Sequence, residues 1–255
     1  MILYKYFPPE RVDVLQNLKI RFSQPRIYND PFELRPIPSS AITEEQFNNI
    51  MPLLIGHHGG PKEAIEEIQK ITYSAFLADP SYVLWLIQEV MASGSLALCL
   101  TEVPDSLLMW AHYGFFHKGF VIGFDTENEF FTCPQGSYFL KRIKYQQQRP
   151  TVIFPNPSPD ETYFTKSLEW EYEREWRLFK RLPAGKSPNE FMQGRDGWPI
   201  YLFDLPAEVM KEIILGCRMD LEQCNMIRAL SKNKLPHADI KAARLSNQKY
   251  ELIIS

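Results

Sequence analysis

Glycine is scarce in this chain, and the glycine-containing signatures of several large enzyme classes are missing. The 255 residues include 12 Gly against 20 Pro. The sequence contains no complete Walker-type phosphate loop and no GxGxxG, GxSxG or HExxH pattern. These patterns carry the phosphate-binding turns, nucleophile elbows and zinc ligands of their classes. Their absence disfavours kinases, Rossmann dehydrogenases, α/β-hydrolases and zincin proteases.

The chain also lacks a strong excess of either charge. It has 28 Lys and Arg against 31 Asp and Glu, for a formal net charge of −3, and its pI is about 6.0. Such a balance argues against a protein that coats nucleic acid or a membrane surface by bulk charge. A local basic patch is still compatible with it.

Long apolar runs and closely spaced cysteines are absent as well. The most apolar stretch, 82–101, is interrupted by Gln88-Glu89 and by Ser93-Gly94-Ser95, so we do not expect it to span a membrane. Residues 1–6 lack the basic region and apolar run of a signal peptide. No CxxC spacing links the cysteines, which predicts buried free thiols and a cytoplasmic protein with no membrane partner. The four cysteines are Cys99, Cys133, Cys217 and Cys224.

Aromatic residues, in contrast, are plentiful at 13% of the chain. With the many prolines they indicate a mixed α+β fold of short segments, mainly antiparallel sheets, in a single domain over 1–255 with a helical insertion at about 41–93. Apolar periodicity predicts the elements. Strands are expected at 3–7, 19–23, 96–101, 119–125, 138–145, 172–179, 200–203, 211–215, 238–245 and 250–254, helices at 10–17, 61–76, 81–91, 104–116 and 220–231, and proline-rich loops at 25–38 and 151–159.

The most unusual local run is Trp-Glu-Tyr-Glu-Arg-Glu-Trp-Arg-Leu-Phe at 170–179. Read as a strand, it places Glu171, Glu173, Glu175 and Arg177 on one face. Carboxylates in such a row repel one another, so a cation should lie opposite them if they are buried, and Arg177 and Lys166 are the local candidates. The alternative is an edge strand whose acidic face is simply solvated.

A second constellation is aromatic and spans 107–119. On a helix, Trp110, Tyr113 and His117 would form one stripe, which suits either ring stacking against a ligand or core packing. The spacing of His112 and His117 does not suit zinc, so no metal site is predicted.

A third constellation is the polar corner Asn-Asp-Pro-Phe-Glu at 29–33. In this corner Asn29 can close an Asx-turn, and the corner either presents Asn29 or Asp30 to a ligand or serves geometry alone. Gly123, inside an apolar strand, hints at a close approach by backbone or ligand.

Taken in order, these motifs resemble a bacterial family called domain of unknown function 2971. The resemblance rests on the Tyr-Lys-Tyr opening, the 29–33 corner, Cys-Leu-Thr-Glu at 99–102, Met-Trp-Ala-His-Tyr at 109–113 and the 170–177 run. Thr101 stands where that family's serine is expected. The family name implies no activity.

The order of the motifs is also similar, more weakly, to the ADP-ribosyltransferase plan. That similarity implies Tyr4 or Tyr6 at the first motif, Thr101 at the second, and Glu173 or Glu175 at the third. It makes NAD the substrate, Glu175 the catalytic carboxylate and Glu173 the group that orients or activates the acceptor. The remaining implied binding residues are Trp110 and Tyr113 as ring walls, Lys118 or Arg177 for the diphosphate, and Asn29, Asp30 and His112.

We therefore expect an NAD-dependent ADP-ribosyltransferase with a nucleic-acid or protein acceptor, in the role of a toxin or phage-defence effector with an antitoxin or immunity partner. One alternative is a non-catalytic ligand-binding or protein-interaction module on the same scaffold. Others are a metal-dependent nuclease that uses Asp125 with Glu173 and Glu175, and an NAD glycohydrolase.

Overall fold

The structure is a computed structural model, and it describes residues 1–38, 43, 45, 73–75, 77–79, 95–132, 138–152, 158–181, 191–193 and 199–255. The elements before the middle of the chain are β1 (Ile2–Phe7), the 3-10 helix η1 (Pro9–Val12), α1 (Asp13–Asn17), β2 (Lys19–Phe22), η2 (Pro25–Ile27), β3 (Ile37–Pro38), β4 (Ser95–Thr101), α5 (Leu107–His112) and β5 (Phe120–Asp125). Those after it are β6 (Tyr138–Arg142), β7 (Lys144–Gln146), β8 (Thr151–Val152), α6 (Pro159–Tyr163), β9 (Thr165–Ser167), η3 (Leu168–Glu173), β10 (Glu175–Arg181), β11 (Phe191–Gln193), β12 (Pro199–Asp204), η4 (Ala207–Val209), β13 (Met210–Leu215), α7 (Leu221–Lys234), β14 (Asp239–Leu245) and β15 (Leu252–Ile254).

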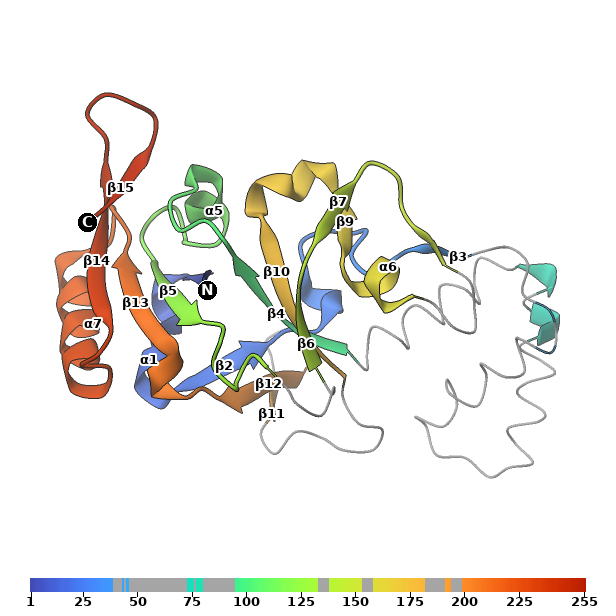
Figure 1. Cartoon of the computed structure of the whole chain (residues 1–255), viewed down its shortest axis with the longest axis horizontal. Helices are drawn as coiled ribbons and strands as arrows, with labels where there is room; N and C mark the ends of the chain where they lie inside the picture. Colours follow the sequence, from blue (N-terminus) through green and yellow to red (C-terminus); the bar gives the residue numbers. More distant parts are fainter. Residues whose placement is uncertain are drawn as a thin grey trace.

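An eight-stranded sheet forms the centre of the described structure, in the order β15-β14-β13-β5-β1-β4-β10-β6 (Figure 1). Its neighbouring strands are antiparallel except for the parallel pair of β13 and β14. The strands β11, β12 and β2 form a smaller sheet, and β3 with β8 and β7 with β9 form two-stranded ones. The predicted α+β class with mainly antiparallel sheets of short strands is confirmed.

This central sheet divides between β1 and β4. The two strands are in register only where Tyr4 faces Thr101. By contrast, β1 pairs with β5 along its whole length, and β4 pairs with β10 along its whole length. The two halves of the sheet therefore diverge from the Tyr4–Thr101 pair, and side chains rather than backbone hydrogen bonds fill the space between them.

Apolar side chains cover both faces of the sheet half around β1, β5 and β13. One cluster joins Leu3, Phe7 and Ile122 to Leu15 of α1 and Ile227 of α7. A second cluster packs α5 against the other face and consists of Tyr6, Met109, Trp110, Val121, Ile214, Ala243 and Leu252. Figure 1 shows α1 and α7 together on one side of this half and α5 apart from them. No helix in the described ranges is both long and apolar enough to cross a membrane.

The predicted helix over 104–116 is shorter in the structure. The Ser106 side chain accepts a hydrogen bond from the Met109 amide and begins α5, which ends at His112. Phe115, Phe116 and His117 then adopt φ values of 47°, 56° and 68°, a left-handed conformation in which no α-helix continues. The predicted helical stripe is therefore wrong, although this turn still brings the His117 ring over Trp110 at a centroid distance of 6.2 Å.

The predicted strand over 172–179 is also wrong in its first half. Residues up to Glu173 form η3, Arg174 is left-handed with φ 42°, and β10 begins only at Glu175. Glu171 and Glu173 thus do not share a strand face with Glu175 and Arg177. The left-handed residue changes the direction of the chain, and no periodicity reveals it.

Several predictions concern parts of the chain that the structure leaves out. The helices over 61–76 and 81–91 lie largely outside the described residues, although 73–75 and 77–78 are helical. Cys133 lies outside them as well.

Cys99, Cys217 and Cys224 are free thiols, as predicted, but they are half-buried rather than buried. The predicted helix over 220–231 is confirmed, with Asp220 as its N-cap.

Gly123 allows two side chains to meet across β5. The Tyr4 hydroxyl donates to Glu212 Oε1 over 2.7 Å, reaching from β1 to β13 past the intervening strand. A Cβ atom on Gly123 would lie 2.7 Å from Glu212 Cγ and 3.0 Å from Tyr4 Cε1. The close approach expected at Gly123 is therefore one of side chains, not of backbone.

We expect Gly123→Ala to lower the free energy of unfolding by about 1–3 kcal/mol, because the added methyl overpacks this crossing. Chemical denaturation measures the change. In a Glu212→Ala background the loss should shrink, since the nearest atom is removed. An equal loss in both backgrounds would contradict this explanation.

Candidate functional site

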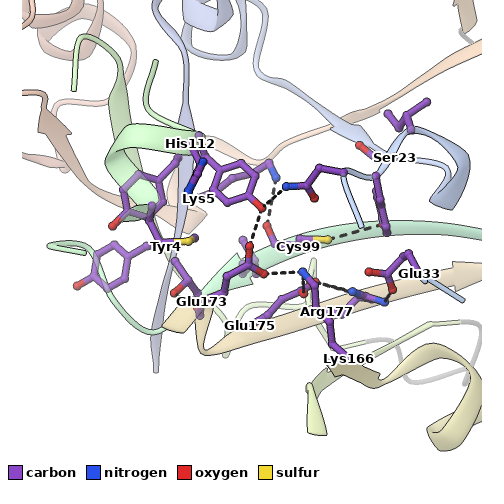
Figure 2. A pocket seen from close by; sticks show the side chains of 18 residues that line it. Tyr4, Lys5, Ser23, Glu33, Cys99, His112, Lys166, Glu173, Glu175 and Arg177 are labelled. Atoms are coloured by element: carbon purple, nitrogen blue, oxygen red, sulfur yellow. Dashed lines mark hydrogen bonds and ion pairs between the residues drawn. The ribbon is translucent and has the colours of Figure 1, made fainter. Parts of the chain in front are cut away.

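A cavity of about 390 Å³ opens where the two halves of the sheet diverge (Figure 2). Its walls come from β1, β4, β9 and β10, from the end of η3, from α5 and from the loop that follows β2. The lining residues are Tyr4, Lys5, Tyr6, Ser23, Ile27, Tyr28, Asn29, Glu33, Cys99, Leu100, Thr101, Met109, His112, Tyr113, Lys166, Glu173, Glu175 and Arg177. We call this cavity the central pocket.

Arg177 organises the floor of the central pocket. Its side chain is 1% exposed. The guanidinium donates to Glu175 Oε1 from Nε at 3.0 Å and from Nη2 at 2.9 Å. It also donates from Nη1 to Glu33 Oε1 at 2.7 Å and to the Tyr163 carbonyl at 2.9 Å. Charge-assisted bonds of this kind are the strong ones in a protein interior, so Arg177 fixes both carboxylates in position.

Lys166 is the second buried cation. Its Nζ atom lies 2.6 Å from Glu173 Oε2 and 3.3 Å from Glu175 Oε2. The ammonium also lies 4.6 Å from the centroid of the Trp170 ring. The cations predicted to face the acidic run are thus Arg177 and Lys166, and the alternative of a solvated acidic face is wrong for Glu173 and Glu175, which are buried.

Glu173 is placed by contacts from three other segments. The Thr101 hydroxyl donates to the Glu173 carbonyl at 2.5 Å. The Tyr113 hydroxyl donates to Glu173 Oε1 at 2.6 Å, and Asn29 Nδ2 donates to the Tyr113 hydroxyl at 3.0 Å. A chain of hydrogen bonds therefore joins three lining residues, from Asn29 through Tyr113 to the Glu173 carboxylate.

The charges around Glu175 determine its protonation state. Burial alone would raise the pKa of its carboxyl, but Arg177 and Lys166 outweigh burial and lower that pKa to about 2. Burial and the Glu175 carboxylate raise the pKa of the Cys99 thiol to about 12, so Cys99 is not a reactive thiolate. Burial lowers the pKa of Lys5.

Most of the residues predicted for the site meet in the central pocket. Those that line it are Tyr4, Tyr6, Asn29, Thr101, His112, Tyr113, Glu173, Glu175 and Arg177. Sequence reasoning missed Lys5, Tyr28, Glu33 and Cys99 as lining residues. Glu33 closes the Asn-Asp-Pro-Phe-Glu motif and Lys5 stands inside Tyr-Lys-Tyr, so both lay within motifs already singled out.

Three predicted residues do not line the central pocket. Asp30 is buried and accepts from the Phe32 amide at 2.8 Å, so it, rather than Asn29, closes the Asx-turn. Trp110 is fully buried and donates from Nε1 to the Pro104 carbonyl at 2.9 Å. Lys118 is exposed, in the turn after α5. The structure therefore gives these three residues no position from which to contact a ligand in the central pocket.

Of the three carboxylates predicted for a nuclease, Glu173 and Glu175 lie together, but Asp125 lies apart from them. Asp125 is on β5, three strands from Glu175 on β10, which is roughly 14 Å at the usual strand spacing. Two oxygen ligands of one metal ion lie within roughly 4–5 Å of each other. Over the described parts of the chain, no group of three or more His, Cys, Asp or Glu side chains is arranged to hold a metal ion.

A family model matches part of the chain. The model of the family described as "Protein of unknown function (DUF2971)" matches residues 109–178, from α5 to β10. This stretch contains Tyr113, Lys166 and the 170–177 run, and the match confirms the resemblance to that family. No curated protein and no solved structure matches the chain.

We expect Arg177→Met to lower the free energy of unfolding by about 3–5 kcal/mol, because it leaves Glu33 buried without its cation and leaves Glu175 with Lys166 alone. Arg174→Gln, on an exposed arginine of the same run, serves as the matched control and should change stability by less than about 0.5 kcal/mol. Urea denaturation compares the two variants. Equal effects would contradict the assigned network.

The stability conferred by Glu175 should depend on pH. Since its pKa falls from 4.5 to about 2 on folding, the ionised carboxylate stabilises the protein above pH 4.5. The shift corresponds to about 3 kcal/mol, which is lost as the pH falls from 4.5 towards 2. Wild type should therefore exceed Glu175→Gln in unfolding free energy at pH 6, and the gap should narrow in acid. A gap independent of pH would refute the assigned ionisation.

Proposed function

We propose that the protein is an NAD-dependent ADP-ribosyltransferase whose chemistry takes place in the central pocket. One observation carries the proposal. Tyr4, Thr101 and Glu175 are among the residues that the similarity to the ADP-ribosyltransferase plan offers for its three motifs, and they lie opposite one another across the adjacent strands β1, β4 and β10. They meet where the sheet divides, so residues far apart in the sequence line one cavity.

The charge of the pocket suits the substrate. The ion-pair network sets the three carboxyl groups of Glu33, Glu173 and Glu175 against the two cations of Lys166 and Arg177. The nicotinamide ring of NAD is cationic, and the ribose becomes cationic as the ring departs. Groups fixed in a buried site before the reaction stabilise such developing charge without reorganising.

Glu175 can accept a hydrogen bond from a ribose hydroxyl. Its Oε1 atom accepts two bonds from Arg177, whereas Oε2 lies 3.3 Å from Lys166 Nζ, and the Cys99 thiol also bonds the carboxylate. An ionised carboxylate offers about four acceptor positions. Oε2 can therefore accept a hydrogen bond from the 2′-hydroxyl, and the low pKa keeps the carboxylate charged at neutral pH.

The transfer itself breaks the bond between nicotinamide N1 and ribose C1′. The electron pair of that bond passes to the ring, which leaves as neutral nicotinamide. The acceptor forms the new bond to C1′, and its proton passes to Glu173 or to water. Tyr113 and Asn29 hold Glu173 in place for this step. With water as the acceptor, the same site would act as an NAD glycohydrolase.

The ring walls differ from the sequence-based assignment. Tyr113 and His112 line the pocket, whereas Trp110 supports it from behind by packing against Tyr6, with ring centroids 5.2 Å apart at 85°. Tyr28 also lines the pocket, with the Arg177 guanidinium 5.5 Å from its ring centroid. These aromatic faces provide places for the nicotinamide ring to stack.

The biological setting that we infer is cytoplasmic, where NAD is abundant. An enzyme that modifies a nucleic-acid or protein acceptor there fits a toxin or phage-defence effector, restrained by an antitoxin or immunity partner. Host cells that express the wild-type protein should grow poorly. Cells that express a Glu175→Gln variant should grow normally.

Nicotinamide release from NAD tests the activity directly. Wild type, supplied with cell extract, nucleic acid and protein as acceptors, should release nicotinamide and transfer labelled ADP-ribose. Glu175→Gln should reduce the rate by about 10²–10³-fold, because the group that stabilises the developing charge is lost. Glu169→Gln, on an exposed carboxylate outside the pocket, is the matched control and should keep full activity.

Thermal melting of each variant separates lost chemistry from lost folding. If Glu175→Gln does not fold, Tyr113→Phe removes only the hydroxyl that holds Glu173 and should still lower the transfer rate. Wild type that turns over no NAD with all three acceptors present would refute the transferase and favour the non-catalytic binding module.

A further inference from the structure

A second cavity, of about 250 Å³, adjoins the central pocket. Lys5, Tyr6 and Ser23 line both cavities, so these residues form the wall between them. The residues that line the second cavity are Lys5, Tyr6, Phe7, Pro8, Glu10, Arg11, Arg21 and Ser23. We call it the basic recess.

Three cations from three different segments line the basic recess. Lys5 comes from β1, Arg11 from η1 and Arg21 from β2. Two carboxylates lie near them: Glu10 lines the recess and is exposed, and Asp13 accepts from Arg11 Nε at 2.9 Å. The cations outnumber these carboxylates, whereas the central pocket sets three carboxyl groups against Lys5, Lys166 and Arg177.

Lys5 lies in the wall that the two cavities share, and charged groups from both cavities affect its pKa. Burial lowers the pKa of its ammonium, with Arg11 and Arg21 lowering it further and Glu175 opposing them. Its Nζ donates to the Cys99 carbonyl at 3.1 Å. An ammonium has three N–H donors, so this bond leaves capacity for an anion in the recess.

The cations assigned to the diphosphate from the sequence are poorly placed for it. Arg177 is buried and its guanidinium is committed to Glu33, Glu175 and a carbonyl. Lys118 lies outside the central pocket, in the turn after α5. A dinucleotide held with its nicotinamide ring in the central pocket still needs a cationic site for its diphosphate.

We propose that the basic recess binds the diphosphate of the dinucleotide through Lys5, Arg11 and Arg21. This inference rests on the proposed function and extends it. NAD carries a cationic ring one ribose away from an anionic diphosphate. The protein places the buried carboxylates of the central pocket next to a recess in which cations are in excess, with Lys5 in the wall between them. Guanidinium groups match phosphate oxygens in geometry as well as charge.

Titration calorimetry with inorganic pyrophosphate and the full chain tests the recess, because it measures binding without requiring catalysis. Arg11→Gln and Arg21→Gln should each weaken pyrophosphate binding by about tenfold, the effect of losing one hydrogen bond to a charged group. Arg244→Gln, on an exposed arginine of β14, is the matched control and should leave the affinity unchanged. Thermal melting shows that each variant is folded.

The KM for NAD provides the second readout. In Arg11→Gln it should rise by a similar factor. Unchanged pyrophosphate affinity in both recess variants would overturn the proposal even if NAD is turned over. Pyrophosphate binding that depends on Arg11, in a protein that turns over no NAD, would instead refute the transferase and retain the recess as a phosphate site.

A short single-stranded oligonucleotide, used as a third probe, separates the two sources of phosphate. The proposal predicts that pyrophosphate competes with NAD and that Arg11→Gln leaves oligonucleotide binding unchanged. Oligonucleotide binding that depends on Arg11, with pyrophosphate binding that does not, would overturn the assignment to a diphosphate.

Discussion

Arg177 keeps a permanent positive charge inside the folded protein. Its side chain is only 1% exposed, and a guanidinium does not lose its proton. A buried charge is costly unless partners surround it. The partners come from three segments: Glu175 from β10 itself, Glu33 from the loop after β2, and the Tyr163 carbonyl from α6. These segments must dock together, and their docking builds the floor of the pocket.

The division of the sheet creates the space above that floor. Had β1 and β4 paired along their length, backbone hydrogen bonds would have filled the region that the central pocket occupies. They are in register only at Tyr4 and Thr101, and each continues with a different neighbour. Lys5 spans the gap to the Cys99 carbonyl, and the same lysine faces the basic recess. A single irregularity in the sheet thus places the cavity that holds the buried carboxylates beside a second, basic one.

Much of the fold follows from local pattern, and its errors have identifiable causes. The strand at 119–125 and the helix at 220–231 were predictable because apolar periodicity and an Asp220 N-cap act over a few residues. The run at 170–179 alternates like a strand over its whole length, yet Arg174 adopts a left-handed conformation and divides it. Glu173 therefore approaches the pocket from a 3-10 helix, held by Thr101 and Tyr113, and only contacts between distant segments favour that arrangement.

The sequence by itself determined which chemical groups were available: a run of carboxylates next to arginine, an aromatic segment, and a constrained Asn-Asp-Pro corner, because composition and spacing are local properties. Tertiary structure alone decided which of these groups meet. Trp110 packs in the core and Asp30 closes a turn, whereas Lys5 and Glu33 line the pocket. The physical reason is that burying Arg177 and Lys166 requires carboxylates from other segments, whereas the aromatic side chains gather in the two clusters that cover the faces of the sheet. The net charge of −3 therefore conceals a pocket of buried ion pairs and a basic recess that share one wall.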